Sequence, residues 1–160
     1  MILVNGQPAE NVGVLDRGLA YGDGVFRTLC MHAGGPLWWH DHYVKLAADC
    51  AALMIVCPEE AGLHAEVCRA AEAGERVVKI LITRGVGARG YALPPKQQMT
   101  TRIVLSTSLP AYAQAATPGD INARWCALRL ARQPRLAGCK HLNRLEYVLA
   151  RAEWKEPDIF

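Results

Sequence analysis

Short apolar runs separated by turn residues dominate the chain and predict β-strands. Runs of this kind, bounded by Gly, Pro, Asn or Asp, are typical of strands. They cover residues 2–4, 25–32, 76–83, 101–108 and 121–130. Asn5-Gly6 is a strong two-residue hairpin signal, so we expect the first strand to fold back directly after it. The run 76–83 is the most continuous, and we predict that it forms a central strand.

Three other segments show the period of an α-helix. Residues 40–56 place four apolar side chains on one face, namely Leu46, Cys50, Leu53 and Met54. Residues 58–73 have Pro in the first turn and Gly directly after the end, which is the usual asymmetry of helix termini. A third helix is predicted over residues 141–154, after a polar turn that contains Pro134.

Strands and helices together predict an α+β fold in two parts. Residues 1–109 hold most of the predicted strands and two of the helices, so we expect them to form one sheet-plus-helices domain. Residues 110–120 are rich in Ala and Pro and lack apolar periodicity, which is typical of a linker. Residues 121–160 are then expected to begin a second domain.

Composition narrows the class of protein. Of the 160 residues, 51% are hydrophobic and 21% are charged, which is typical of a globular protein with a core. The net charge is +3 and the isoelectric point is about 8.6. Nucleic-acid-binding domains carry a basic run or a recognition motif, and neither is present here. The sequence therefore predicts no nucleic-acid partner.

The six cysteines point to a reducing compartment. Most of them lie inside apolar runs at irregular spacing, which favours buried free thiols over a disulfide framework. The N-terminal segment turns polar too soon for a signal peptide, and no apolar run is long enough to cross a bilayer. We therefore expect a cytoplasmic protein without a membrane partner.

Three common chemistries find little support. Residues 85–90 read G-x-G-x-x-G, but a dinucleotide site needs a helix next, and Tyr91 is followed instead by a Pro-Pro loop. A nucleotide-binding oxidoreductase would rest on this loop alone. His40 and His42 lack a third ligand at a useful spacing, so no metal site is predicted. The Gly-x-Ser-x-Gly elbow of acyl-transfer serines is absent.

Lys140 stands out among the five lysines of the chain. It follows an apolar Leu-Ala-Gly-Cys stretch and precedes a polar cluster, and Arg135 and Arg144 flank it in sequence. Desolvation or a neighbouring cation lowers the pKa of a lysine amine and frees it for Schiff-base chemistry. The alternative is an ordinary solvated lysine at the start of a helix.

Three stretches carry a resemblance to a known family. Residues 136–146 read Leu-Ala-Gly-x-Lys-His-Leu-Asn-Arg-Leu-Glu, which resembles the active-site segment of the aminodeoxychorismate lyase family of fold-type IV pyridoxal phosphate (PLP) enzymes. Residues 16–26 resemble the N-terminal signature of fold-type IV enzymes, and residues 84–91 resemble their substrate-side loop. The resemblance implies an N-terminal domain followed by only the start of the C-terminal domain. The family's pyridine-nitrogen partner and most of its phosphate cup would lie beyond residue 160.

The resemblance also implies roles for single residues. Lys140 would be the Schiff-base lysine and the general base. Lys45 stands where the family's His-x-x-Arg-Leu has Arg, so it would contact the PLP phosphate as a point charge. Arg89 and Tyr91 would contact the substrate. Solvated surface positions remain the alternative for Lys45 and Arg89.

The implied reaction converts 4-amino-4-deoxychorismate to 4-aminobenzoate and pyruvate in folate synthesis, in a homodimer that takes a small-molecule substrate and PLP. Two alternatives stay open. One is a fold-type IV aminotransferase acting on D- or branched-chain amino acids. The other is an inactive fragment that serves only as a folded or self-associating module.

Overall fold

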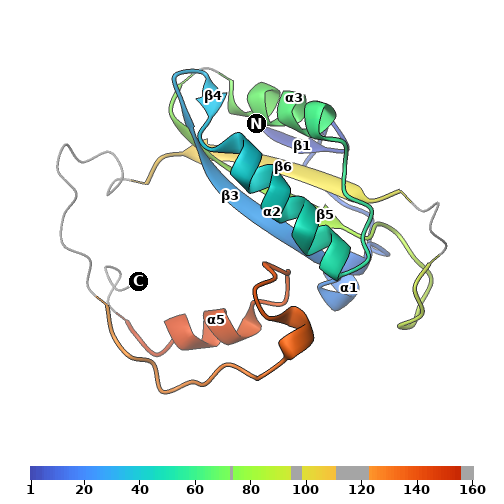
Figure 1. Cartoon of the computed structure of the whole chain (residues 1–160), viewed down its shortest axis with the longest axis vertical. Coiled ribbons are helices and arrows are strands. Elements are labelled where there is room, and N and C mark those ends of the chain that lie inside the picture. Colours follow the sequence, from blue (N-terminus) through green and yellow to red (C-terminus); the bar gives the residue numbers. More distant parts are fainter. Residues whose placement is uncertain (73, 95–98, 111–122, 156–160) are drawn as a thin grey trace.

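A six-stranded antiparallel sheet forms the centre of the computed structural model, which describes residues 1–72, 74–94, 99–110 and 123–155 (Figure 1). The strand order is β2-β1-β6-β5-β3-β4, so β5 lies inside the sheet, as predicted. The strands are β1 (Ile2–Val4), β2 (Gln7–Pro8), β3 (Gly24–His32), β4 (Gly35–Pro36), β5 (Arg76–Thr83) and β6 (Thr101–Ser108).

Four α-helices and one short 3-10 turn complete the described part of the chain. They are α1 (Arg17–Tyr21), α2 (Trp39–Ala52), α3 (Glu60–Ala71), the 3-10 turn (Pro134–Leu136) and α5 (Leu145–Arg151). None of these helices is long and apolar enough to cross a membrane.

Local chemistry explains where these helices begin and end. The short α1 was not predicted; the Asp16 side chain caps it by accepting a hydrogen bond from the N–H of Gly18 at 2.8 Å. Helix α2 is shorter than predicted, because Leu53 closes it and Met54 takes a φ of 55° with an exposed side chain. At α3, the Glu59 carboxylate caps the helix by accepting hydrogen bonds from two backbone N–H groups of its first turn.

One predicted strand is wrong. Residues 123–130 form no strand, and the predicted residues before them lie outside the described part of the chain. Their side chains are mostly exposed, Trp125 almost completely so. The backbone N–H groups of Ala127 and Leu128 are taken by the side chain of Glu153 instead of a neighbouring strand. Apart from Pro110, the predicted linker 110–120 also falls outside the described residues.

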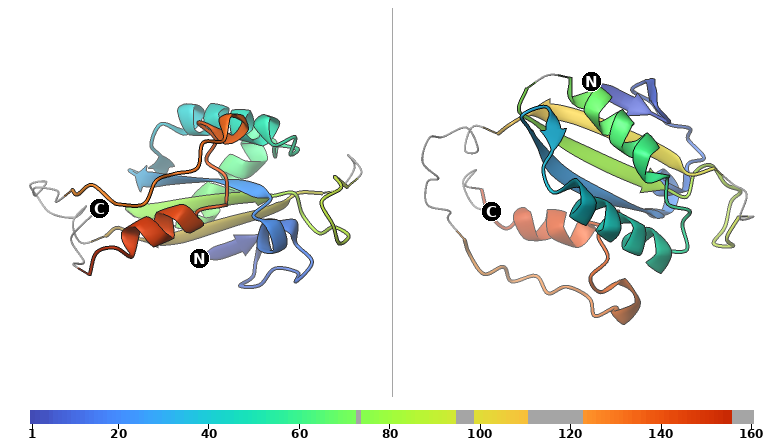
Figure 2. Two further views of the ribbon diagram at one scale, coloured as in Figure 1. Left: turned by 90° about the horizontal axis from the view of Figure 1, so that it is seen from below. Right: turned by 45° about the horizontal axis from the view of Figure 1, so that its top comes forward.

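Helices α2 and α3 cover one face of the sheet and enclose the core (Figure 2). Fully buried side chains on both layers fill it: Leu46, Cys50, Leu63 and Val67 from the helices, and Val25, Val78, Ile80, Ile82 and Val104 from the strands. Each such aliphatic side chain contributes about 1.5–3 kcal/mol by leaving water. The strands therefore form a rigid platform, and α5 lies beside its β3 edge (Figure 1).

Candidate active site

Lys140 lies on a segment that docks against the free edge of β3. The N–H of Phe26 donates to the carbonyl of Lys140 at 2.9 Å, and the N–H of Leu142 donates to the carbonyl of Gly24 at 2.9 Å. Val25 and His141 form the antiparallel bridge between these two bonds. This pairing uses the backbone that a helix would need, so α5 starts later than the predicted residue 141.

Glycines at the start of β3 leave room for this segment. A Cβ on Gly24 would lie 2.7 Å from Cδ1 of Leu142 and 2.6 Å from the carbonyl oxygen of Ile82. A Cβ on Gly22 would lie 2.3 Å from Oδ1 of Asn143, and Gly22 has a φ of 62°. The glycine-rich stretch near residue 22 and the lysine stretch near residue 140 therefore pack directly on each other.

Helix α2 holds the same segment from its other side. Lys45 Nζ donates to the carbonyl of Gly138 at 2.8 Å and also pairs with the Asp49 carboxylate. That carboxylate accepts from the backbone N–H of Lys140 at 3.2 Å, and the Cys139 thiol points to the Asp49 carbonyl at 3.9 Å. Lys140 is thus fixed between α2 and β3.

Cations crowd around the amine of Lys140. Its Nζ and that of Lys79 each lie 4.9 Å from the centroid of the Phe26 ring, and Cζ of Arg144 lies 5.4 Å from it. Burial lowers the pKa of Lys140 below its ordinary value, and the charges of Arg27, Arg144 and Lys79 add to this, against the opposing charge of Asp49. Less free energy is therefore needed to form the neutral, nucleophilic amine at Lys140 than at a solvated lysine.

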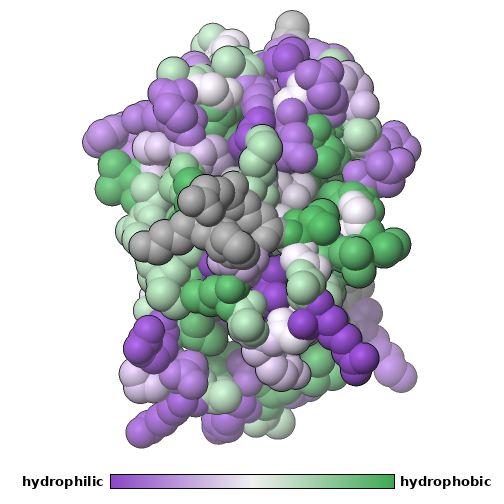
Figure 3. Space-filling model, turned by 90° about the vertical axis from the view of Figure 1, so that its right-hand side faces the viewer, coloured by the Kyte–Doolittle hydropathy of each residue, from purple (hydrophilic) through white to green (hydrophobic). Residues whose placement is uncertain are grey.

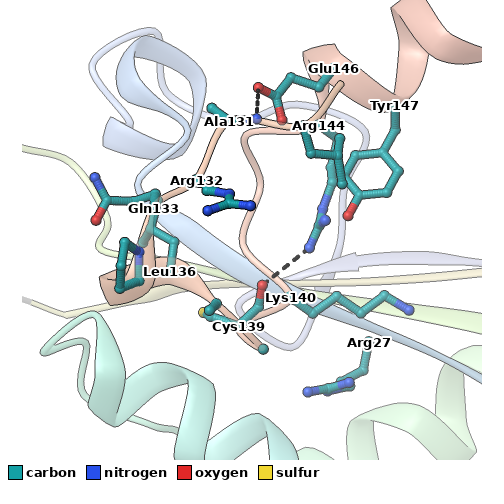
Figure 4. Close-up of a pocket in the computed structure, with 14 residues that line it drawn as sticks. Arg27, Ala131, Arg132, Gln133, Leu136, Cys139, Lys140, Arg144, Glu146 and Tyr147 are labelled. Atoms are coloured by element: carbon teal, nitrogen blue, oxygen red, sulfur yellow. Dashed lines mark hydrogen bonds between the residues drawn. The ribbon is translucent and has the colours of Figure 1, made fainter. Parts of the chain in front are cut away.

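A pocket of about 740 Å³ opens beside this amine. Figure 4 shows Arg27, Lys140, Arg144 and Tyr147 among its lining residues, with the hydrogen bond from Arg144 to the carbonyl of Cys139 at 3.3 Å. Pockets of roughly 300–1,000 Å³ are usual for small ligands. A small anionic molecule with a group that reacts with amines would suit this lining.

The structure brings together only two of the four predicted site residues. Lys45 and Lys140 meet through Gly138 and Asp49, but only Lys140 lines the pocket described above, and Lys45 lines a second pocket of about 280 Å³. Arg89 and Tyr91 lie on the loop after β5, outside the lining of both pockets. Both side chains are exposed, and the ring of Tyr91 lies 5.5 Å from that of Tyr21.

That loop is anchored at its base. The side chains of Arg17 and Tyr21 bond the backbone of Gly90, each at 2.9 Å. Arg84, the first residue of the predicted substrate-side loop, is buried and paired with Asp23. Apolar side chains gather on the end of the molecule that faces the viewer in Figure 3. The loop after β5 also contributes an exposed apolar side chain, that of Val86.

Sequence reasoning missed Arg27 and Asp49. Arg27 lies on the core-facing side of β3, between buried Val25 and Leu29, and its guanidinium binds the carboxylate of Asp49. Asp49 precedes buried Cys50 on α2. A charged residue on the inward face of each predicted element was the signal that could have found both.

Comparison with known proteins gives this site a context. Residues 24–160 match the amino-transferase class IV family. The chain belongs to the class IV aminotransferase family. An aminodeoxychorismate lyase from Vibrio harveyi is 36% identical over 154 residues, which are 96% of this chain and 56% of that protein.

Solved structures of two proteins resemble this chain. The crystal structure of 4-amino-4-deoxychorismate lyase from Pseudomonas aeruginosa is 42% identical, with a TM-score of 0.85 over 99% of this chain and 58% of that one. The branched-chain amino acid aminotransferase of Escherichia coli shares the fold, at 22% identity and a TM-score of 0.78 over 95% of this chain and 55% of that one. The chain thus spans a little more than half the length of these relatives.

These comparisons confirm the α+β fold of fold-type IV enzymes and the similarity to aminodeoxychorismate lyases. The class IV aminotransferase family is PLP-dependent. The domain boundary and the roles of Lys140, Lys45, Arg89 and Tyr91 stay predictions.

Proposed function

We propose that the protein is a PLP-dependent lyase that converts 4-amino-4-deoxychorismate to 4-aminobenzoate and pyruvate, with Lys140 as its cofactor-binding lysine and general base. The observation that carries the proposal is Lys140 itself: contacts with α2 and β3 fix its backbone, it lines a pocket, and its amine has a lowered pKa. The similarity to two proteins named aminodeoxychorismate lyase supports this choice of reaction.

The residues present fit the chemistry of PLP, which has an aldehyde and a phosphate. Lys140 would hold the aldehyde carbon through its amine. Arg27, which lines both pockets, and Lys45, which lines the smaller one, would serve the phosphate. The buried Nε of Arg27 has no hydrogen-bond partner within the described structure. A charged donor left unsatisfied in this way is costly unless a ligand completes it.

Bound PLP supplies an electron sink for the carbon that carries the substrate's nitrogen. The chain's own residues perform the proton transfer. With the substrate bound, the neutral Lys140 amine would take the proton from that carbon. Burial and the charges of Arg27 and Arg144 lower the pKa of this amine, which favours the neutral form that the base needs. The same amine would return this proton to the departing oxygen, so that pyruvate leaves in its enol form and the remaining ring becomes aromatic.

We further propose a cytoplasmic homodimer that takes a small-molecule substrate. All six cysteines are free thiols, as a reducing compartment would keep them. Exposed apolar side chains on α5, among them Leu145, Val148 and Leu149, provide surface for a partner subunit. Sedimentation velocity over a range of concentrations tests the dimer.

Borohydride trapping tests the proposed role of Lys140. The chain is incubated with PLP, reduced and digested, and the pyridoxyl mass is located among its lysines. We expect the label at Lys140, its loss in Lys140→Ala, and release of 4-aminobenzoate from aminodeoxychorismate. Label on surface lysines alone, or none, would contradict the proposal and favour a non-catalytic folded module.

A class IV aminotransferase activity is the second candidate, because the chain belongs to that family. It would use the same lysine but transfer the amino group to a 2-oxo acid. Parallel assays with aminodeoxychorismate and with 2-oxo acids plus D- or branched-chain amino acids separate the two. Formation of an amino acid without 4-aminobenzoate would favour the aminotransferase.

A further inference from the structure

Asp49 stands at the centre of the contacts around Lys140. It lies on the inner side of α2, and its side chain is only 2% exposed. Its carboxylate accepts from the backbone N–H of Lys140 at 3.2 Å and from the side chains of Arg27 and Lys45. These donors come from three separate parts of the chain: the lysine segment, β3 and α2 itself.

A buried carboxylate must find such donors, because losing water without replacement bonds destabilises its charged form. Helix α2 alone offers Asp49 only the half-exposed Lys45. The other two bonds form only when the Lys140 segment and Arg27 are in place. The buried charge of Asp49 is therefore fully hydrogen-bonded only when Lys140 and Arg27 are in the positions that the candidate site requires.

We propose that Asp49 is the positioning residue for Lys140: its carboxylate fixes the backbone of Lys140 and holds Arg27 beside the amine. The catalytic consequence rests on the proposed function. The placement of the amine can be measured without any cofactor.

Charged groups from every neighbouring element face the Lys140 amine. Arg27 of β3, Lys79 of β5 and Arg144 of the following turn are cationic, His42 of α2 also interacts with the amine, and Asp49 is the opposing anion. Removing the charge of Asp49 alone should lower the pKa of Lys140 further. Removing its hydrogen bond as well should release the segment into water and return the pKa toward the ordinary value of about 10.4.

Two variants separate these effects. Asp49→Asn keeps an oxygen that can accept from the N–H of Lys140 but removes the charge. Asp49→Leu removes both. Glu66→Gln is the matched control, because the Glu66 carboxylate is also largely shielded from water, at 13% exposed, and is paired with an arginine, Arg102, on the α3 side of the sheet.

The measurement is competitive acetylation of the full chain over a range of pH, with each lysine quantified by mass spectrometry relative to exposed Lys155. In Asp49→Asn, the half-maximal pH for acetylation of Lys140 should fall, because the anion that favours its ammonium form is gone. In Asp49→Leu, it should rise. Glu66→Gln should leave it unchanged.

Circular dichroism shows whether each variant folds; if Asp49→Leu does not, the isosteric Asp49→Asn still decides. An unchanged Lys140 profile in folded Asp49→Asn, or an equal shift in Glu66→Gln, would overturn the proposal. Borohydride trapping with PLP runs beside it. If the unsubstituted chain takes no label at Lys140, the proposed function fails, whereas the acetylation profile still decides the role of Asp49.

Discussion

At the scale of single residues, Arg144 is one of the cations that act on the amine of Lys140. Arg135 and Arg144 flank it in sequence, but only Arg144 is among the charges that lower its pKa. Arg135 is exposed on the 3-10 turn. Arg144 instead folds back, donating to the carbonyl of His141 at 2.9 Å and stacking with Phe26. Proximity in space, not in sequence, decides which arginine acts on the amine.

Replacing Arg144 should therefore change the titration of Lys140. In Arg144→Gln, we expect the pKa of Lys140 to rise, because one of the cations that disfavours the ammonium form is gone. Reductive methylation with labelled formaldehyde followed by NMR titration of the dimethyl-lysine signals measures this pKa directly. Arg135→Gln is the control and should leave the pKa of Lys140 unchanged. A rise of equal size in both variants would refute the assignment.

The turn before Lys140 depends on one glycine. Gly138 has a φ of 75°, and a Cβ there would meet no atom within 4 Å. Gly138→Ala should therefore cost only the backbone strain, about 1–2 kcal/mol of unfolding free energy. Urea denaturation measures this loss. Gly35→Ala, which has the same open space but no positive φ, should cost less; equal losses would show that strain at Gly138 is not the cause.

At the scale of elements, turn residues and periodicity predicted β1, β3, β5 and β6 with nearly correct bounds, because these strands are delimited locally. They failed at residues 123–130, where an apolar run found no partner edge. They also failed at the start of α5, where β3 captures the backbone of Leu142. Pairing with a distant segment leaves no local signal.

The same limit applies to the site. The motif around Lys140 identified that lysine, since a continuous stretch of sequence carries it. It could not identify Arg27 or Asp49, because they act through contacts between distant segments. Asp49 and Lys140 are more than ninety positions apart in the chain.

The docking of the lysine segment on β3 can be tested as a unit. In Gly24→Ala, the new methyl group would collide with Leu142 and with the backbone of Ile82. We expect a loss of about 1–3 kcal/mol in stability and faster hydrogen exchange at the N–H of Phe26 and Leu142. Gly35→Ala again serves as control. Unchanged protection of both N–H groups would contradict the docking.

At the scale of the whole molecule, Asp23 joins parts that are far apart in sequence. Its carboxylate pairs with Arg17 of α1 at 2.9 Å and with Arg84 after β5 at 2.7 Å. Arg84 in turn donates to the carbonyls of Leu53 and Met54 at 2.7 and 2.8 Å, at the end of α2. One half-buried carboxylate, paired with two buried arginines, therefore connects the sheet, α1 and α2 at the end of the sheet where β3 begins.

This arrangement makes the stability of the protein depend on pH. Burial alone would raise the pKa of Asp23, but the hydrogen bonds and charges of Arg84 and Arg17 outweigh it, so the pKa lies below its ordinary value of 3.8. A carboxyl whose pKa is lower in the folded state stabilises the fold fully above its unfolded pKa. That contribution is lost as the pH falls through the folded pKa.

Asp23→Asn should reveal this contribution. At pH 7 it leaves the guanidinium groups of Arg17 and Arg84 buried without their anion, and breaking a buried pair in this way costs about 3–5 kcal/mol. Urea denaturation should show that the difference from the unsubstituted chain shrinks as the pH falls below the ordinary value of 3.8 and on through the lower folded pKa, because Asp23 takes up its proton in both states only below the folded pKa. Asp41→Asn, on the exposed side of α2, should cost little at either pH. A difference that stays constant down to pH 3 would show that the pairing of Asp23 with its arginines does not set the acid limit of this fold.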